Sequence, residues 1–249
     1  MKTAITYRNT IFNIDLSKPL DISIPLRGTN KNVTAWYVNH PKFTPVMENG
    51  FVGDVNLGGA VNFRNIFFNP HGNGTHTECV GHISKEQFTI NQCLKQFTYY
   101  SKLVTITPNQ IDGDNIITLE QIKKQWKNDE ADAIIIRTLP NTNNKLEQQY
   151  SNTNPTYIHH EAVQYLVNNG LKHLLIDTPS IDREEDGGKL LAHHVFWDYP
   201  DNPQLERTIT ELIYAPDEIK DDYYILQFQI ASFENDASPS KPILYEILA

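Results

Sequence analysis

The sequence predicts a mixed α/β fold in a single domain that covers residues 1–249. Strand-like runs rich in β-branched and aromatic residues occupy both ends of the chain, and apolar runs alternate with helix-like segments in the middle. The 249 residues suffice for one large core, and neither an internal repeat nor a Pro/Gly/Ser-rich linker divides them. We therefore expect central sheets with helices packed against them, and functional side chains on loops at strand ends.

Predicted strands mark the two ends of the chain. Each run is short and is bounded by Pro, Gly, Asn or Asp, which break regular structure. The predicted strands cover residues 2–7, 11–16 and 61–68 in the first part of the chain, and 208–214, 223–233 and 243–248 in the last third. A long stretch around Pro41 and Pro45 has no regular pattern and predicts a substantial irregular loop.

The middle of the chain predicts the α/β core. In order, the expected elements are a strand at 103–106, a helix from 118 to about 127, a buried strand at 131–138, a helix at 157–169 and a buried strand at 173–177. Thr118 and Gln121 have the spacing of a capping box at the start of the first helix. Gly170 is placed to end the second helix in a left-handed conformation. The strand-helix-strand unit between 131 and 177 is suited to parallel pairing.

Charge and composition exclude several classes of partner. The formal net charge is −9, with 21 basic residues mixed among 30 acidic ones, so the chain has no basic stripe for a phosphate backbone. No stretch has the apolar character of a secretory signal or the length of a membrane-spanning helix. We expect a cytoplasmic protein that binds neither nucleic acid nor membrane. Cys79 and Cys93 are too few for a disulfide framework, and we expect both to be reduced.

Clustered histidines are the strongest chemical feature of the sequence. Five of the nine histidines fall in two groups, with a glutamate inside the first: His71, His76, Glu78 and His82, then His193 and His194. Imidazole and carboxylate ligands suit zinc, manganese and iron, and a catalytic site needs about three such ligands with one open position. The alternative is a Gly-rich turn that carries surface histidines.

The first group has a spacing that can gather its side chains at one point. Gly72 and Gly74 allow positive φ angles, so a loop can turn the imidazoles of His71 and His76 toward each other. Glu78 lies two residues after His76, which in an extended segment puts both on the same side. The sequence therefore predicts a metal site here.

Six segments, in order along the chain, resemble the cyclase or kynurenine-formamidase-like family of metal-dependent hydrolases. The family signature His-x-Gly-Thr-His-x-Asp-x-Pro-x-His corresponds to Gly72-Asn-Gly-Thr-His-Thr-Glu-Cys-Val-Gly-His82. The other matching segments are Asp15-Leu-Ser-Lys-Pro-Leu20, Asp177-Thr-Pro-Ser-Ile-Asp182, Ala192-His193, Thr210-Glu211-Leu212 and Ser238-Pro-Ser-Lys-Pro242. The resemblance implies the swivelling β/α/β fold of that family over the whole chain.

The resemblance also implies roles for individual residues. His76 and Glu78 would bind a divalent metal, zinc or manganese, and His193 with Glu211 would complete a second metal position. Gly72 stands where the family has its first histidine, so His71 would take that place only if the loop bulges. The ligand set implied for one or two ions is His71, His76, Glu78, His193 and Glu211, with His82 as the general acid/base. Glu206 competes with Glu211 for the carboxylate position.

Residues outside these segments have plainer expectations. Trp36, Tyr37 and Phe43 lie where the family shapes substrate access, so they are candidates for substrate binding, with packing as the equal alternative. We expect His194, next to His193 in a strand, to point to the opposite face. The other histidines, His40, His159, His160 and His173, are expected at the surface or as helix caps. Arg137 and Arg183 would bind a substrate carboxylate or, more plainly, pair with neighbouring acids.

The function predicted from these features is metal-dependent hydrolysis of an amide, formamide, lactam or lactone bond in a small molecule, as in arylformamidases. Two alternatives stay open at this point. One is a family member without metal that acts as a small-molecule binding protein. The other is an isomerase or dehydratase that uses His82 and Glu78 for proton transfer without net hydrolysis. The resemblance further implies a homodimer or homotetramer.

Overall fold

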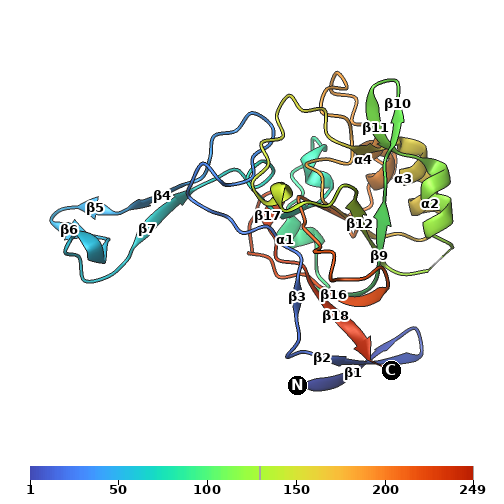
Figure 1. The fold of residues 1–249 in the computed structure, drawn as a ribbon, viewed down its shortest axis with the longest axis horizontal. Helices are drawn as coiled ribbons and strands as arrows, with labels where there is room; N and C mark the ends of the chain where they lie inside the picture. The colour runs from blue at the N-terminus through green and yellow to red at the C-terminus, as the bar shows by residue number, and fades with distance from the viewer. Residues whose placement is uncertain (129, 249) are drawn as a thin grey trace.

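A computed structural model describes residues 1–128 and 130–248. These residues form a body built on one large mixed sheet, from which a narrow two-stranded arm projects (Figure 1). The sheet strands, in spatial order, are β1 (Lys2–Tyr7), β2 (Thr10–Asp15), β18 (Ile243–Leu248), β16 (Tyr223–Gln227), β9 (Thr98–Ile106), β12 (Ala133–Thr138), β14 (His173–Ile176), β15 (Thr208–Glu211), β8 (His76–Glu78) and β17 (Ala237–Pro239), while β3 (Leu20–Asp21) pairs with β18. The mixed α/β fold expected from the sequence is confirmed.

The centre of the sheet is parallel and its flanks are antiparallel. Strands β9, β12, β14 and β15 run parallel to one another, whereas β16 and β8 close the two sides in antiparallel pairing. Helix α3 (His160–Asn168) connects β12 to β14, so the strand-helix-strand unit predicted from the apolar runs is confirmed. The carboxyl ends of the parallel strands therefore meet at one edge, where α/β proteins place their ligand sites.

Helices α2 (Leu119–Gln125), α3 and α4 (Leu191–Trp197) pack on one face of this centre. Helices α2 and α4 lie beside α3 (Figure 1). Strand β12 alternates between two cores: Ile134 and Ile136 join the cluster under the helices, whereas Ile135 joins the cluster on the opposite face. The remaining helical segments are α1 (Ile90–Cys93), η1 (Val55–Leu57), η2 (Val80–His82) and η3 (Asn143–Leu146). Burial on both faces explains why the strand is uniformly apolar.

The capping residues predicted from the sequence lie at the ends of α2 and α3. Thr118 and Gln121 form the reciprocal capping box of α2, and Gly170 has a φ of 87° after α3, both as expected. Helix α3 begins at His160 rather than 157, because Tyr157–Ile158 forms the short strand β13 beside β11 (Asp114–Ile117), which also pairs with β10 (Asn109–Ile111). His159 accepts a bond from the N–H of Glu161 as the N-cap of α3, so its expected capping role is confirmed.

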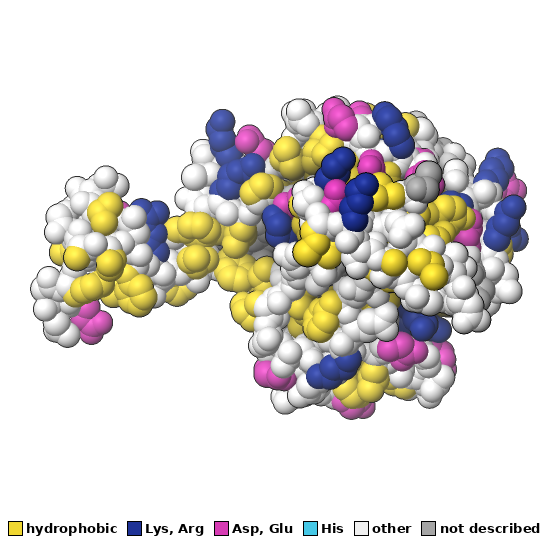
Figure 2. Space-filling view, turned by 90° about the horizontal axis from the view of Figure 1, so that it is seen from below, with side chains coloured by type: hydrophobic (Ala, Val, Ile, Leu, Met, Phe, Trp, Pro, Cys, Tyr) yellow, Lys and Arg dark blue, Asp and Glu magenta, His cyan; other side chains and the backbone are white. Residues whose placement is uncertain are grey.

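The arm contradicts the irregular loop expected around Pro41 and Pro45. Strand β4 (Lys42–Pro45) pairs with β7 (Arg64–Phe67), and β5 (Met47–Glu48) pairs with β6 (Phe51–Val52) at the tip. Proline is tolerated here because the arm has only two strands, which leaves N–H positions that no ladder bond requires. Figure 2 shows hydrophobic side chains along the arm and where it joins the body.

Two histidine expectations are wrong. His173 is buried at the start of β14 with 1% of its surface exposed, because its Nδ1 has a partner in the Oγ1 of Thr208 at 2.8 Å and needs no water. His194 lies in helix α4, not in a strand, and its Nδ1 lies 2.9 Å from the carbonyl oxygen of Tyr199. The carboxylate of Asp182 accepts the N–H groups of Ala192 and His193 in the first turn of α4, a long-range cap that no local pattern reveals.

Both arginines pair with acids of the chain. Arg137 Nη2 lies 2.9 Å from Asp221 Oδ1, and Arg183 Nε lies 3.1 Å from Asp114 Oδ2. The plainer of the two expectations for Arg137 and Arg183 is therefore confirmed. Within residues 1–128 and 130–248, no helix has the length and apolar character needed to cross a bilayer.

Candidate metal centre

Strands β8 and β15 place three site residues next to one another. In the antiparallel register His76 of β8 lies opposite Glu211 of β15, and Glu78 lies two positions along the same strand. Alternation in an extended strand then puts His76 and Glu78 on one face, as the sequence predicts. All three side chains are buried, with at most 3% of their surface exposed. Glu206, the competing carboxylate, is exposed before β15 begins.

The loop before β8 brings His71 to the same point. Gly72 packs so closely that a Cβ there would lie 2.9 Å from the carbonyl oxygen of Ala35 and 2.6 Å from the side chain of Val38. Only glycine fits this approach. Its role is steric, because neither Gly72 nor Gly74 has the positive φ angle expected from the sequence. Nδ1 of His71 lies 3.1 Å from Oε2 of Glu78. The extra residue between His71 and His76 is accommodated in the loop.

Glu78 is the centre of the cluster. Its Oε1 lies 3.3 Å from Nε2 of His193, and its Oε2 lies 3.1 Å from Nδ1 of His71 and 3.7 Å from Nδ1 of His82. Burial alone would raise the pKa of this carboxyl, but His82, His193 and His71 around it hold the pKa well below its usual range. Glu78 is therefore ionised within a shell of three imidazoles.

His193 is oriented by a carboxylate behind it. Helix α4 buries His193 against the cluster, and its Nδ1 donates to Oδ2 of Asp182 at 2.7 Å. This bond turns Nε2 toward Glu78 and places it 3.8 Å from Oε1 of Glu211. Although burial disfavours the imidazolium, the hydrogen bond to Asp182 and the nearby carboxylates of Glu78 and Glu211 raise the pKa of His193 to about 10. The adjacent His194 points elsewhere.

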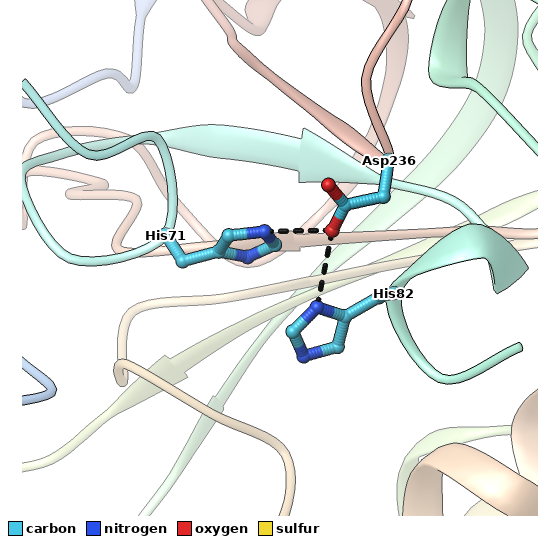
Figure 3. A group of neighbouring side chains, drawn as sticks. All are labelled: His71, His82 and Asp236. Atoms are coloured by element: carbon cyan, nitrogen blue, oxygen red, sulfur yellow. Dashed lines mark hydrogen bonds and ion pairs between the residues drawn. The ribbon is translucent and has the colours of Figure 1, made fainter. Parts of the chain in front are cut away.

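His82 stands at the open side of the cluster with an aspartate that the sequence analysis did not identify. Asp236, directly before β17, accepts from both His82 and His71 through one carboxylate oxygen (Figure 3). Its only signal in the sequence was its position two residues before the matching Ser238-Pro239 segment. Burial disfavours the imidazolium of His71, but Asp236 and Glu78 raise the pKa of His71 to about 10.

The cluster fits a metal ion. Nε2 of His76 and both carboxylate oxygens of Glu78 are buried and lack a hydrogen-bond partner among the described residues. Three overlapping groups have ligand atoms within 4.8 Å of one another: His71, His76 and Glu78; Glu78, His82 and His193; and His71, His82 and Asp236. Orphaned buried polar atoms are costly unless something satisfies them. Imidazole nitrogens and carboxylate oxygens are the donor set of zinc and manganese sites.

A cavity of about 380 Å³ opens onto this cluster. Its lining residues are Trp36, Val38, Asn69, His71, His82, Ser180, Leu190, His193 and Glu211. Trp36 thus lies where the sequence analysis expects a substrate contact, whereas Tyr37 lines a neighbouring hollow. Phe43 lies on the arm, where its ring packs against Gly28, and it does not line the cavity. Trp36 and Tyr37 both have left-handed backbones, with φ of 56° and 58°, a conformation that is strained for bulky side chains.

Comparisons with known proteins place the chain in a family. The sequence profile of a family described as "Putative cyclase" matches residues 14–183. A solved structure described as a potential metal-dependent hydrolase with cyclase activity is 18% identical, with a TM-score of 0.67 over 93% of this chain and 99% of that one. A predicted metal-dependent hydrolase from Bacillus stearothermophilus is 17% identical, with a TM-score of 0.66 over 92% and 98% of the two chains.

A third solved structure, an isatin hydrolase bound to the product analogue thioisatinate, is 13% identical, with a TM-score of 0.66 over 93% of each chain. No curated protein sequence matches the chain. These likenesses to solved structures, all at low identity, establish the shared fold.

Proposed function

The chain belongs to the cyclase family, and on that basis we propose that it is a metal-dependent hydrolase of an amide, formamide, lactam or lactone bond in a small molecule. One observation carries the proposal: the unpartnered buried atoms of His76 and Glu78 converge with His71, His193 and Glu211 beside an open cavity. Similar structures are described as metal-dependent hydrolases or isatin hydrolases, which is consistent with this chemistry.

The proposed ligands divide into a central carboxylate and the groups around it. Glu78 presents one oxygen to His71 and the other to His193, so it is placed to touch either one ion or two. Nε2 of His76 lies 3.4 Å from Oε2 of Glu211, and both side chains are buried. We propose zinc or manganese as the ion, because both accept this mixture of imidazole and carboxylate. When bound, the ion supplies a Lewis acid for the scissile carbonyl and lowers the pKa of an attacking water.

His82 is the proposed general acid/base. It is the most exposed of the four clustered histidines, with 30% of its side chain accessible, and it lines the cavity. Its imidazole would accept the proton of the attacking water and return it to the leaving nitrogen or oxygen, for which an imidazole is well suited near neutral pH. The hydrogen bond from Nδ1 of His193 to Asp182 fixes the orientation of the neighbouring imidazole.

Trp36 gives the cavity an apolar part of its lining, beside the histidines. With Val38 and Leu190 it favours a flat, small substrate, while Asn69 and Ser180 supply polar groups. Tyr37 extends this surface into the neighbouring hollow, so we propose contact with the distal part of a larger substrate. For Phe43 we propose the packing role, because its ring closes on Gly28.

The test is elemental analysis of the protein purified without chelator, beside His76→Ala and a control variant, His160→Ala, whose ring lies on α3 away from the cluster. We expect near-stoichiometric zinc or manganese in the wild type and the control, and loss of metal in His76→Ala. The loaded protein is then screened against formanilides, cyclic amides and lactones in ¹⁸O-labelled water. If the purified protein contains no metal and does not bind added zinc or manganese, the result would support the alternative of a metal-free small-molecule binding protein. Turnover without ¹⁸O in the product would support the isomerase or dehydratase.

We also propose that the chain forms a homo-oligomer through its arm. Eight exposed large apolar side chains lie on the arm: Met47, Phe51, Val55, Leu57, Val61, Phe63, Ile66 and Phe67. Lys42 and Arg64 balance Glu48 and Asp54, so the arm is neutral while the chain as a whole carries −9. A second copy is the partner that a neutral apolar arm suits, because two such arms can cover each other's exposed apolar side chains without bringing net like charge together. Light scattering of Phe63→Ser/Ile66→Ser should show a monomer where the wild type shows a dimer or tetramer; a monomeric wild type would refute the proposal.

A further inference from the structure

We propose that Asp236 is a positioning residue that sets the tautomer and orientation of two histidines, His71 and His82, through one carboxylate oxygen. This inference rests on the proposed function, in which His71 binds metal and His82 moves a proton. It assigns a role to a carboxylate that the sequence analysis did not identify, and it explains how a displaced histidine still serves the site.

Figure 3 shows one carboxylate oxygen of Asp236 in contact with the rings of both His71 and His82. Oδ2 of Asp236 lies 2.8 Å from Nε2 of His71 and 3.2 Å from Nδ1 of His82. The two rings lie 4.4 Å apart and are tilted by 33°. A carboxylate oxygen only accepts, so both ring nitrogens that face it must carry a proton.

The two bonds select different tautomers. Once its second proton is lost on metal binding, His71 keeps its proton on Nε2 and the lone pair on Nδ1, the nitrogen that lies 3.1 Å from Oε2 of Glu78 and faces the metal cluster. With its proton on Nδ1, His82 keeps the lone pair on Nε2, the nitrogen on the far side of the ring from Asp236 (Figure 3). One histidine is thereby prepared as a ligand and the other as a base. A second partner of this kind fixes the working nitrogen of an imidazole.

The backbone of Asp236 is tied to the strand that carries the ligands. Its carbonyl oxygen accepts the N–H of Cys79 at 3.0 Å, directly after Glu78. The next residue, Ala237, pairs with Glu78 in the register of β17 and β8. These backbone bonds hold Asp236 beside Glu78, and His71 lies between their carboxylates, 2.8 Å from Oδ2 of Asp236 and 3.1 Å from Oε2 of Glu78. This clamp places His71 in the cluster although it lies five residues before His76.

The variants Asp236→Asn and Asp236→Ala test the inference, with Glu234→Gln as the control. Glu234 lies on the same loop, but its carboxylate accepts from Thr89, Asn91 and Gln92 instead of the cluster. We expect zinc affinity, measured by competition with a chromogenic chelator, to fall about 10- to 100-fold in Asp236→Ala and less in Asp236→Asn. Glu234→Gln should bind zinc as the wild type does.

The decisive readout is the ring tautomer, from long-range ¹H–¹⁵N correlations of the zinc-loaded wild type. We expect the proton of His71 on Nε2 and that of His82 on Nδ1, with the preference of His82 lost in Asp236→Ala. A wild type with His82 protonated on Nε2 would overturn the inference without any variant, and so would unchanged zinc affinity in Asp236→Ala. If the tautomers and affinities behave as expected but no substrate is hydrolysed, the positioning role stands and the proposed hydrolase fails.

Discussion

Two fully buried histidines, His173 and His193, lie at opposite ends of the parallel centre of the sheet and behave in opposite ways. Burial lowers the pKa of His173 to about 3, with a further contribution from Lys172. Burial would do the same to His193, but Asp182, Glu78 and Glu211 raise its pKa to about 10. His173 is therefore neutral and His193 is cationic at neutral pH in the metal-free chain.

The pKa values of the two histidines differ because carboxylates surround His193 and not because one ring is more deeply buried. His173 begins β14, where its ring lies 3.9 Å from Tyr99 and its Nδ1 bonds to Thr208. His193 lies at the carboxyl end of the strands, where acids from three elements converge. The sheet thus separates a structural end from a chemical end. In this chain the buried histidine at the chemical end is the one that buried acids accompany.

The largest expected effect comes from removing the chemical histidine. His193→Ala should lower zinc affinity by more than about 100-fold, because loss even of an outer-shell partner costs 10- to 100-fold. Hydrolytic activity should disappear with the metal. The matched control is His194→Gln, whose ring faces the carbonyl of Tyr199. If His193→Ala binds zinc with wild-type affinity, the metal site does not lie at the carboxyl end of the parallel strands, where His193 is placed.

The second prediction concerns the structural histidine and stability. The pKa of His173 is about 3 in the folded chain, against 6.5 as its ordinary value. Below pH 6.5 the unfolded chain takes up a proton that the folded chain refuses, so stability is lost as the pH falls from 6.5 toward 3. The loss amounts to several kcal/mol, since one pKa unit corresponds to about 1.4 kcal/mol.

Urea unfolding of the metal-free wild type and of His173→Asn between pH 7 and pH 4.5 measures this difference. The variant lacks the titrating ring but keeps a group that can bond to Thr208, so its free energy of unfolding should fall less steeply with pH. Parallel pH profiles for the two proteins would contradict the assignment of a buried neutral ring.

The third prediction concerns the metal centre, where the pKa values of the histidines are raised, whereas that of His173 is lowered. The pKa values of His71 and His193 are raised to about 10, so the stability that they contribute is present below pH 6.5 and is lost as the pH rises toward 10. At pH 7 both rings are protonated without metal and must lose a proton to bind it. Zinc binding should therefore release about two protons per cluster and strengthen as the pH rises.

Calorimetric zinc titrations in buffers of different ionisation enthalpy count those protons. His71→Gln should release about one proton fewer than the wild type, because one titrating ring is gone. A proton count near zero in the wild type would mean that the imidazoles are already neutral, and the contrast with His173 would disappear.

Much of the fold could be predicted from local pattern. The uniformly apolar runs of β12 and β14 indicated a buried parallel pair, and Thr118 with Gln121 indicated the start of α2. Alternation also placed His76 and Glu78 on one face of β8. These features depend on residues a few positions apart, and their period follows from the geometry of strand and helix.

The sequence by itself thus determined the α/β core, the capping of α2 and α3, and the histidines and acids of the first motif. Tertiary structure alone decided the rest: Asp236 meets His71 across 165 positions, and Asp182 caps a helix that the local pattern does not mark. It also buried His173 and extended the arm. Such contacts depend on how distant segments are brought together by the packing of the whole sheet, and that information is absent from any short stretch of the chain.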